Sequence, residues 1–437
     1  MTDLVREIAG PSDLRQLHRE YPSRYPFLLQ STGRGGALNR YDVLFAFPGK
    51  ALVAGTGTNF LDELDVHWQK ERTHTAANEL PFTGGWFLYL GYELAAEIEP
   101  GLQLKPDTIL PAAFAVRCPV ALVFDHEESR CFLVCETPGC VNKDQLQADI
   151  DSLQGACSAE KAKVISVQEE EPTLFTDAVV RAKEYIADGD VYQANLSREW
   201  AAQMDGTPDA SDIYEVLCQS NPGPFAGMAR WRDIEIISSS PERLLEVRNG
   251  VASTRPIAGT RPRSDDVALD DNLSAELFAH PKERAEHIML VDLERNDLGR
   301  ICEAGTVEVN EMMVLESYAH VHHIVSNVQG QLRSDVTPGQ AIAAVFPGGT
   351  ITGCPKVRCM EIISELEQGP RGAYTGSFGY LNRNGSLDLN ILIRTIVKQG
   401  NKVTFRAGSG IVADSVPEAE LEETRAKAEG MLRAIAR

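Results

Sequence analysis

The chain has 437 residues, of which 43% are hydrophobic, so it is long enough to bury one large core or two ordinary ones. Its 63 acidic residues outnumber the 42 basic ones, giving a formal charge of -21 that repels phosphate backbones and anionic lipid. Nucleic acids and membranes are therefore excluded as expected partners.

The amino-terminal residues contain no apolar run of signal-peptide length, and no stretch approaches the ~20 apolar residues of a membrane helix. The nine cysteines include no C-x-x-C pair, which fits neither a disulfide framework nor a zinc cluster. We expect a cytoplasmic protein whose thiols are reduced.

The predicted elements divide the chain into three parts. Residues 1–135 are mainly strand-like, with apolar runs separated by Gly, Pro and charged turns. Residues 136–173 are polar and predict a connecting segment with at most a short helix. Residues 174–437 mix helices and strands, and they hold most of the candidate chemistry. We therefore expect an amino-terminal region, a connection and a catalytic region.

Four elements of the third part matter most. Thr176 is a predicted N-cap for a helix that ends near Gly189, and a strand follows it. A second helix is expected to begin near Pro281. The glycine-rich loop at 347–356 leads into another helix, whose free N–H groups suit an anion. The last predicted helix begins at Pro417.

Two of these helices carry paired carboxylates. Glu283 and Glu286 are three residues apart, as are Glu420 and Glu423, so each pair shares a helix face; Lys427 lies one turn further. If the two faces converge, the carboxylates would repel one another unless a cation lay between them, and all-oxygen ligands favour Mg²⁺. The alternative is that acidic first turns only complement the helix dipole.

Three further residues are candidates for chemistry. Glu242 follows Ser-Pro at a strand end, where burial would raise its pKa and make it a general acid; a surface turn is the alternative. His323 lies in a strand-like segment, where a hydrogen-bonding role is a better expectation than metal ligation. Arg394 lies in an apolar strand, so we expect a carboxylate partner, either structural or from a ligand.

Six motifs occur in an order that resembles the chorismate-utilising enzymes. They are GDVYQANL (189–196), SPE (240–242), PIAGT (256–260), AEHIMLVDLERND (285–297), PGGTITGCPK (347–356) and AGSGIVADS (407–415). The likeness is greatest to the synthase subunits that aminate chorismate, aminodeoxychorismate synthase and anthranilate synthase. It implies an α+β fold, with large antiparallel sheets packed as a sandwich and helices outside, to which both halves of the chain contribute.

The resemblance also implies roles for individual residues. Glu286 and Glu423 would ligate Mg²⁺, assisted through water by Glu283 and Glu420. Glu242 would protonate the departing C4 hydroxyl of chorismate, and Gln193 replaces the lysine base of water-adding relatives, which leaves ammonia as the nucleophile. His323 would bear on whether pyruvate is eliminated. The substrate pocket would be formed by Gly259, Thr260, Thr350, Tyr374, Arg394, Gly408, Gly410 and Lys427.

The source of ammonia and the product are separate expectations. The chain has no amidotransferase segment, so a separate glutamine amidotransferase subunit is expected. Tyr192-Gln193-Ala194-Asn195, Val321-His322-His323 and the short amino-terminal region favour 4-amino-4-deoxychorismate, the precursor of para-aminobenzoate and folate. Ala258 favours anthranilate, because many aminodeoxychorismate synthases have a nucleophilic lysine there. We interpret Ala258 as leaving C2 open to ammonia without a covalent enzyme adduct.

Two further interpretations stay open. The chain could be a non-catalytic ligand-binding subunit, although an intact Glu242 argues against that. The amino-terminal region of the family can also hold tryptophan, in a pocket that Ser31, Arg40 and Tyr41 would border here. The family's Leu-Leu-Glu-Ser motif reads Leu-Leu-Gln-Ser in this chain, with glutamine at Gln30.

Overall fold

The computed structural model describes residues 5–32, 39–55, 59–74, 79–137, 139, 143–153, 163–264, 266–279, 281–317 and 321–436. None of the helices within these ranges combines the length and the apolar character needed to cross a bilayer.

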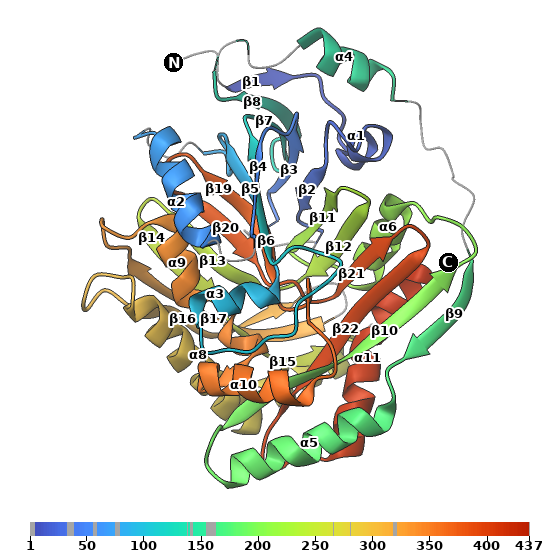
Figure 1. The fold of residues 1–437 in the computed structure, drawn as a ribbon, viewed down its shortest axis with the longest axis vertical. Coiled ribbons are helices and arrows are strands. Elements are labelled where there is room, and N and C mark those ends of the chain that lie inside the picture. Colours follow the sequence, from blue (N-terminus) through green and yellow to red (C-terminus); the bar gives the residue numbers. More distant parts are fainter. Residues whose placement is uncertain are drawn as a thin grey trace.

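Two large antiparallel sheets form the centre of the molecule (Figure 1). The first sheet has 12 strands: β1 (Val5–Ile8), β8 (Arg130–Cys135), β7 (Val120–Asp125), β3 (Tyr41–Ala46), β2 (Phe27–Gln30), β11 (Phe225–Trp231), β12 (Ile234–Ser240), β21 (Thr395–Gln399), β22 (Lys402–Ile411), β10 (Gln193–Met204) and β18 (Gly353–Cys354), with β9 (Val164–Glu169) also paired to β10. The second has 10: β15 (Ile257–Pro262), β17 (Val321–Gln331), β14 (Val251–Arg255), β13 (Arg243–Arg248), β20 (Leu387–Asn390), β19 (Ser377–Asn382), β5 (Gly85–Leu90), β6 (Ala113–Cys118) and β4 (Ala51–Val53), with β16 (Glu308–Ser317) paired to β17.

An aromatic core joins the inner faces of the sheets. Phe27 of the first sheet stacks on Phe87 of the second with ring centroids 4.0 Å apart, and Phe45 meets Phe87 edge to face at 5.5 Å. All three rings are buried. Such contacts add to the burial of apolar area that drives sheet packing. The expected α+β sandwich of antiparallel sheets is confirmed.

Helices cover the outer faces of both sheets (Figure 1). A cluster on the first sheet includes residues of α1, α4, α6 and α11, and one on the second includes residues of α2, α8 and α9. The bounds are α1 (Arg15–Glu20), α2 (Phe60–Glu71), α3 (Ala95–Ile98), α4 (Lys143–Asp151), α5 (Pro172–Ala187), α6 (Ala210–Ser220), α7 (Val267–Ala279), α8 (Pro281–Gly299), α9 (Pro338–Val345), α10 (Lys356–Leu366) and α11 (Pro417–Ile435), with short 3₁₀ turns η1 (Tyr92–Leu94) and η2 (Gly349–Ile351).

The amino-terminal region contributes strands to both sheets. β2 pairs with β11 in the first sheet and β5 pairs with β19 in the second. The segment 136–173 contains α4, β9 and the start of α5. The expected N-cap at Thr176 is wrong: α5 begins at Pro172, and the Thr176 hydroxyl donates to the Thr173 carbonyl. Proline at the first helical position suits the helix start.

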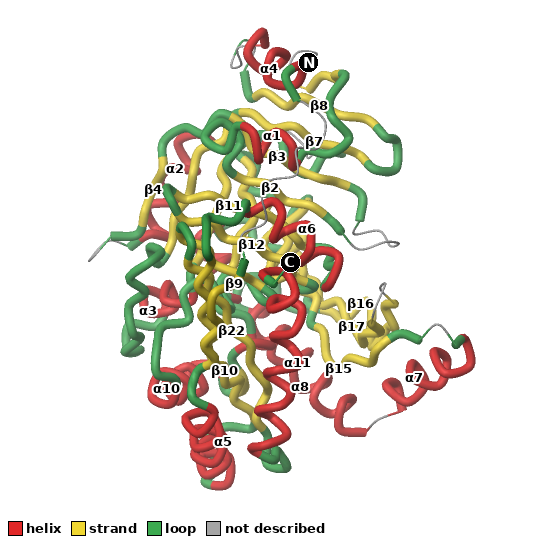
Figure 2. The backbone as a smooth tube through the Cα atoms, turned by 90° about the vertical axis from the view of Figure 1, so that its right-hand side faces the viewer, coloured by secondary structure: helices red, strands yellow, loops and turns green. Residues whose placement is uncertain are grey.

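The other predicted helix starts agree with the structure. α8 begins at Pro281, α11 begins at Pro417, and Pro355 is the N-cap of α10. Helix α11 packs beside β22, as Figure 2 shows, and α8 packs against β15 and β17. This arrangement brings the acidic turns of both helices to the glycine-rich end of β22.

Candidate active site

One cavity of about 650 Å³ gathers almost all of the predicted site residues. It is lined by β10, β15, β17, β22, η2, α8 and α11, which come from distant parts of the chain. The predicted residues in its lining are Gln193, Glu242, Ala258, Gly259, Glu283, Glu286, His323, Thr350, Tyr374, Arg394, Gly408, Gly410, Glu420, Glu423 and Lys427. The side chain of Thr260 falls outside the described part of the structure, although its backbone belongs to β15.

Glu242 is a buried carboxyl at the turn between β12 and β13. Its residue is 5% exposed, and its Oε1 has no hydrogen-bond partner among the described residues. Ile391 donates from its backbone N–H to the Glu242 carbonyl at 3.0 Å, which holds the turn in place. Burial raises the pKa of Glu242 to about 7, while the charge of Arg394 acts in the opposite direction. This is the environment of a general acid at neutral pH.

Arg394 supplies a positive charge to the same cavity. Its backbone has φ of 51°, a left-handed conformation that costs free energy in a residue other than glycine. No hydrogen bond or ion pair of its guanidinium occurs within the described ranges, and burial lowers its pKa, opposed by the charge of Glu242. The sequence left open whether Arg394 pairs with a structural carboxylate. No such partner is found among the described residues. An anionic ligand group would satisfy the guanidinium.

Ala258 and Gly259 form an irregular end of β15. The pairing register with β17 shifts between Ala258 and Thr260, and Gly259 has φ of +71°. A Cβ on Gly259 would lie 2.7 Å from the Leu277 side chain and 3.0 Å from Glu283 Oε2. Glycine is therefore required by both conformation and space. The bulge brings the small Ala258 side chain to the cavity wall.

Gln193 connects β10 to α8. Its Nε2 donates to Glu286 Oε1 at 2.9 Å, and its buried Oε1 has no partner in the described residues. A Cβ on Gly410 would lie 2.3 Å from Gln193 Nε2, so glycine at this position makes room for the amide. An amide cannot accept a proton from water at neutral pH, so Gln193 is unsuited to act as a base.

The four predicted carboxylates lie along the same cavity, and two of them, Glu423 and Glu283, have basic neighbours. Lys427 pairs with Glu423 at 2.7 Å and donates to the Gly408 carbonyl at 3.0 Å, while Arg261 approaches Glu283 at 3.4 Å. Within the part of the chain that the structure describes, no three acidic, histidine or cysteine side chains form a ready metal cluster. The all-oxygen donor set fits Mg²⁺ in chemistry, and an ion would have to draw the side chains together.

Three uncharged groups complete the lining. Burial lowers the pKa of His323 to about 4, so its ring is neutral and its Nδ1 donates to the Gly259 carbonyl at 3.3 Å. Burial raises the pKa of Tyr374 to about 12, which keeps its hydroxyl protonated. The Thr350 hydroxyl is buried, and its interaction with the Glu242 carboxyl opposes the rise of that carboxyl's pKa. These groups can donate or accept hydrogen bonds without adding charge.

Sequence reasoning missed two arginines of this cavity. Arg261 directly follows the PIAGT motif and contacts Glu283, and Arg406 precedes the AGSG motif. Arg406 donates to the Ser197 hydroxyl at 3.1 Å and approaches Glu367 at 3.4 Å, so it is held by the protein. The signal available in the sequence was that each arginine adjoins a motif. Their partners are identified only by the packing of β15 against α8, for Arg261, and of β22 against β10, for Arg406.

A sequence model of the chorismate-binding enzymes matches residues 25–433 of this chain. The chain belongs to this family. It is therefore an enzyme that acts on chorismate. The cavity described above is lined by the residues that the resemblance predicted for the site.

Relatives of this chorismate-binding enzyme carry two different names. An anthranilate synthase component I-like protein from Synechocystis is 43% identical over 83% of this chain and 75% of its own length. Aminodeoxychorismate synthase component 1 from Bacillus subtilis is 38% identical over 97% of this chain and 94% of its own. The crystal structure of anthranilate synthase component I from Streptococcus pneumoniae superposes with a TM-score of 0.80, at 31% identity, over 91% of this chain and 93% of that one. The names leave the product undecided.

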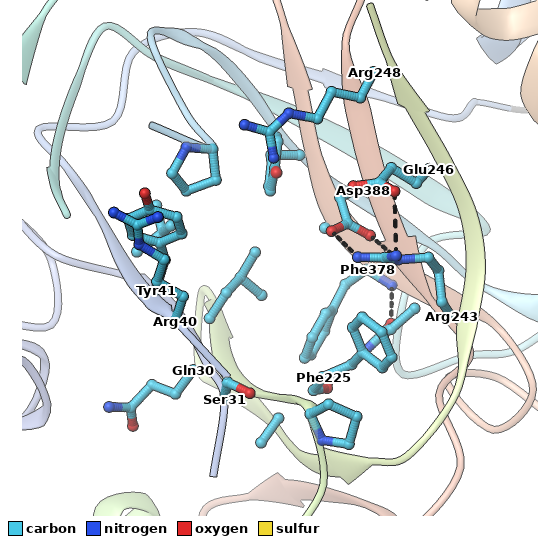
Figure 3. Close-up of a pocket in the computed structure, with 18 of the residues that line it drawn as sticks. Gln30, Ser31, Arg40, Tyr41, Phe225, Arg243, Glu246, Arg248, Phe378 and Asp388 are labelled. Carbon is cyan, nitrogen blue, oxygen red and sulfur yellow. Dashed lines mark hydrogen bonds and ion pairs between the residues drawn. The ribbon is translucent and has the colours of Figure 1, made fainter. Parts of the chain in front are cut away.

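The chorismate-binding enzyme has a second cavity, of about 510 Å³, between the two sheets (Figure 3). The predicted residues Ser31, Arg40 and Tyr41 all line it. Arg40 stacks over the Tyr41 ring at 4.9 Å and pairs with Asp125 at 2.8 Å. The opposite wall contains aromatic side chains and the Arg243 guanidinium, which binds Asp388 at 2.9 Å. Aromatic faces with charges of both signs would suit a zwitterionic aromatic molecule.

Proposed function

We propose that this enzyme aminates chorismate with ammonia from a glutamine amidotransferase partner, giving 4-amino-4-deoxychorismate for para-aminobenzoate and folate synthesis. The observation that carries the proposal is the pair of Glu242 and Arg394 in one cavity, a buried acid whose pKa is raised to about 7 and a guanidinium with no ion pair among the described residues. A substrate with carboxylates and a hydroxyl to be lost fits this pair. Gln193 supports ammonia rather than water as the nucleophile, because its amide cannot serve as a base.

The substrate would be held by groups at opposite sides of the cavity. Arg394, Tyr374 and the backbone at Gly408 and Gly410 would bind the enolpyruvyl carboxylate, with Thr350 lining the pocket. Glu286 and Glu423 would hold Mg²⁺, assisted by Glu283 and Glu420; the bound ion would neutralise the ring carboxylate and draw electron density from the ring. Lys427 would lie close to that carboxylate.

Glu242 would give its proton to the leaving C4 hydroxyl. Ala258 would leave C2 open, so that ammonia adds there and a second step delivers the amine to C4 without a covalent bond to the enzyme. The buried, neutral His323 would bear on whether pyruvate is lost. Because no lysine stands at position 258, no adduct on the protein is required.

The alternative product is anthranilate, which Ala258 favours. Purified protein, chorismate, Mg²⁺ and ammonium chloride should give 4-amino-4-deoxychorismate by chromatography and mass spectrometry, and a chelator in excess over Mg²⁺ should stop its formation. Anthranilate as the main product, with release of pyruvate, would contradict the proposed product. A covalent adduct found on any lysine by intact-protein mass spectrometry would contradict the proposed mechanism.

We also propose that the second cavity binds tryptophan. Ligand binding to the folded state stabilises it by RT ln(1 + [L]/Kd), about 2.7 kcal/mol at 100-fold excess over Kd. We therefore expect tryptophan to raise the unfolding temperature in a thermal shift assay. Ser31→Phe, which places a large side chain in the cavity, should abolish this rise. Without ligand, the variant should unfold at the native temperature. Equal shifts for both proteins would show that tryptophan does not bind at this cavity.

A further inference from the structure

Two amide side chains of β10 lie next to each other in the wall of the catalytic cavity. Gln193 and Asn195 are two residues apart at the start of this strand, and both line the cavity. Side chains at such spacing point to the same face of a strand, about 7 Å apart along it. The cavity wall therefore presents a pair of amides, of which Asn195 has no role in the proposed function.

The protein fixes which way each amide is turned. Gln193 Nε2 donates to Glu286 Oε1 at 2.9 Å, and Asn195 Nδ2 donates to the Thr350 carbonyl at 3.4 Å. Turning either amide over would set its oxygen against another oxygen, which has no proton to offer. The amide nitrogens are thus used by the protein, and the oxygen of each amide faces away from that partner.

Both amide oxygens are buried and lack a hydrogen bond. Gln193 Oε1 and Asn195 Oδ1 have no partner among the described residues. The strand that pairs with β10 does not cover them: a Cβ on Gly408 would lie 2.9 Å from Asn195 Oδ1, and one on Gly410 would lie 2.3 Å from Gln193 Nε2. A buried acceptor without a donor costs free energy, so a ligand that supplies two donors would be favoured here.

Chorismate cannot supply both donors. With its two carboxylates ionised, its one donor is the C4 hydroxyl, and the proposed function places that hydroxyl at Glu242. Ammonia has three N–H groups. Two of them can be given to Gln193 Oε1 and Asn195 Oδ1, and the lone pair of the nitrogen stays available to form the bond to carbon. The chemistry of the two acceptors therefore fits the second substrate and not the first.

We propose that the amide oxygens of Gln193 and Asn195 form the binding subsite for ammonia. The inference rests on the proposed function, in which ammonia is the nucleophile, and it holds for either amine product. It assigns Asn195 as a residue that binds the co-substrate, and it gives Gln193 a second role as an acceptor. Ala258, whose small side chain would leave C2 of chorismate open, lines the same cavity.

The test is the dependence of chorismate consumption on ammonia, supplied as ammonium chloride at one fixed pH with saturating Mg²⁺. Asn195→Leu has nearly the native size but no acceptor, so the KM for ammonia should rise about three- to tenfold, the range that one neutral hydrogen bond contributes. The KM for chorismate should stay within about twofold of the native value, because the groups proposed to bind its carboxylates are unchanged. Neither KM depends on how much of a variant folds.

Two further variants separate the acceptor from the rest of the amide. Asn195→Asp keeps an oxygen in the same place but loses the donor to Thr350, so it should not show the rise. Asn401→Leu is the matched control: this exposed amide also donates to a carbonyl at 3.4 Å, that of Met204, and its loss should leave both KM values native. Should Asn195→Leu yield no folded protein, Asn195→Ala carries the same expectation without added bulk.

The possible results distinguish the subsite from the proposed function. An unchanged KM for ammonia in the leucine or alanine variant of Asn195, or an equal rise in Asn195→Asp, would overturn the subsite. A rise in the KM for chorismate alone would also overturn it, because Asn195 would then act through Thr350 and the first substrate. Failure of the native enzyme to consume chorismate with ammonium would instead contradict the proposed function.

Discussion

Replacement of Glu242 by glutamine should reduce chorismate turnover by about 10²- to 10⁴-fold, the range that general acid catalysis contributes. Glutamine has nearly the same size but no acidic proton, so the leaving hydroxyl would depart unassisted. The turn should keep its shape, because Ile391 bonds to the backbone of Glu242 and not to its side chain. Steady-state consumption of chorismate measures the loss.

The same variant should still bind chorismate. The groups proposed to bind carboxylate, at Arg394, Tyr374 and Gly408, are untouched by the substitution. Isothermal titration with chorismate and Mg²⁺ should therefore give an affinity close to that of the native protein. Glu215→Gln, an exposed position on α6, serves as the control with native turnover. If Glu242→Gln turned chorismate over at the native rate, Glu242 would not be the acid.

The pH dependence of the native enzyme's rate should reveal the titration of Glu242. The pKa of Glu242 is raised to about 7, so the protonated form that acts as the acid is present below that pH. The rate should therefore fall as the pH rises through about 7. The residual activity of Glu242→Gln should lack this alkaline limb.

Replacement of Arg394 by lysine should lower kcat/KM for chorismate by about 10- to 100-fold, since a charge-assisted hydrogen bond contributes about 1.5–3 kcal/mol. Lysine keeps the charge but loses the planar fork that binds a carboxylate through two parallel bonds. Both residues bear the same backbone cost at φ of 51°, so the comparison isolates the head group.

The loss should appear mainly in KM if Arg394 binds the substrate equally in the ground and transition states. Arg433→Lys, an exposed position on α11, is the matched control and should behave as native. Thermal unfolding of Arg394→Lys should stay near the native temperature, because the guanidinium has no ion pair to lose among the described residues. Native kcat/KM in Arg394→Lys would exclude a carboxylate contact at this residue.

Much of the site could be predicted because its chemistry is local in sequence. Glu283 and Glu286 share a helix face by spacing alone, and Pro281 and Pro417 indicated where the two acidic helices begin. The order of the six motifs predicted the family. The helix start predicted at Thr176 was wrong because α5 begins at Pro172, where proline suits the first helical position.

The sequence by itself determined which residue types could do the chemistry, the family to which the chain belongs and the α+β class. Only the tertiary structure decided what each charge faces. Arg394 was equally compatible with a structural carboxylate until β21, β22 and the Glu242 turn were placed together. Glu294 of α8 is 6% exposed, and nothing in the sequence indicated its burial, since a glutamate on a predicted helix is normally exposed. Its burial arises because α8 packs between η2 and β14, and such long-range packing cannot be deduced from local periodicity.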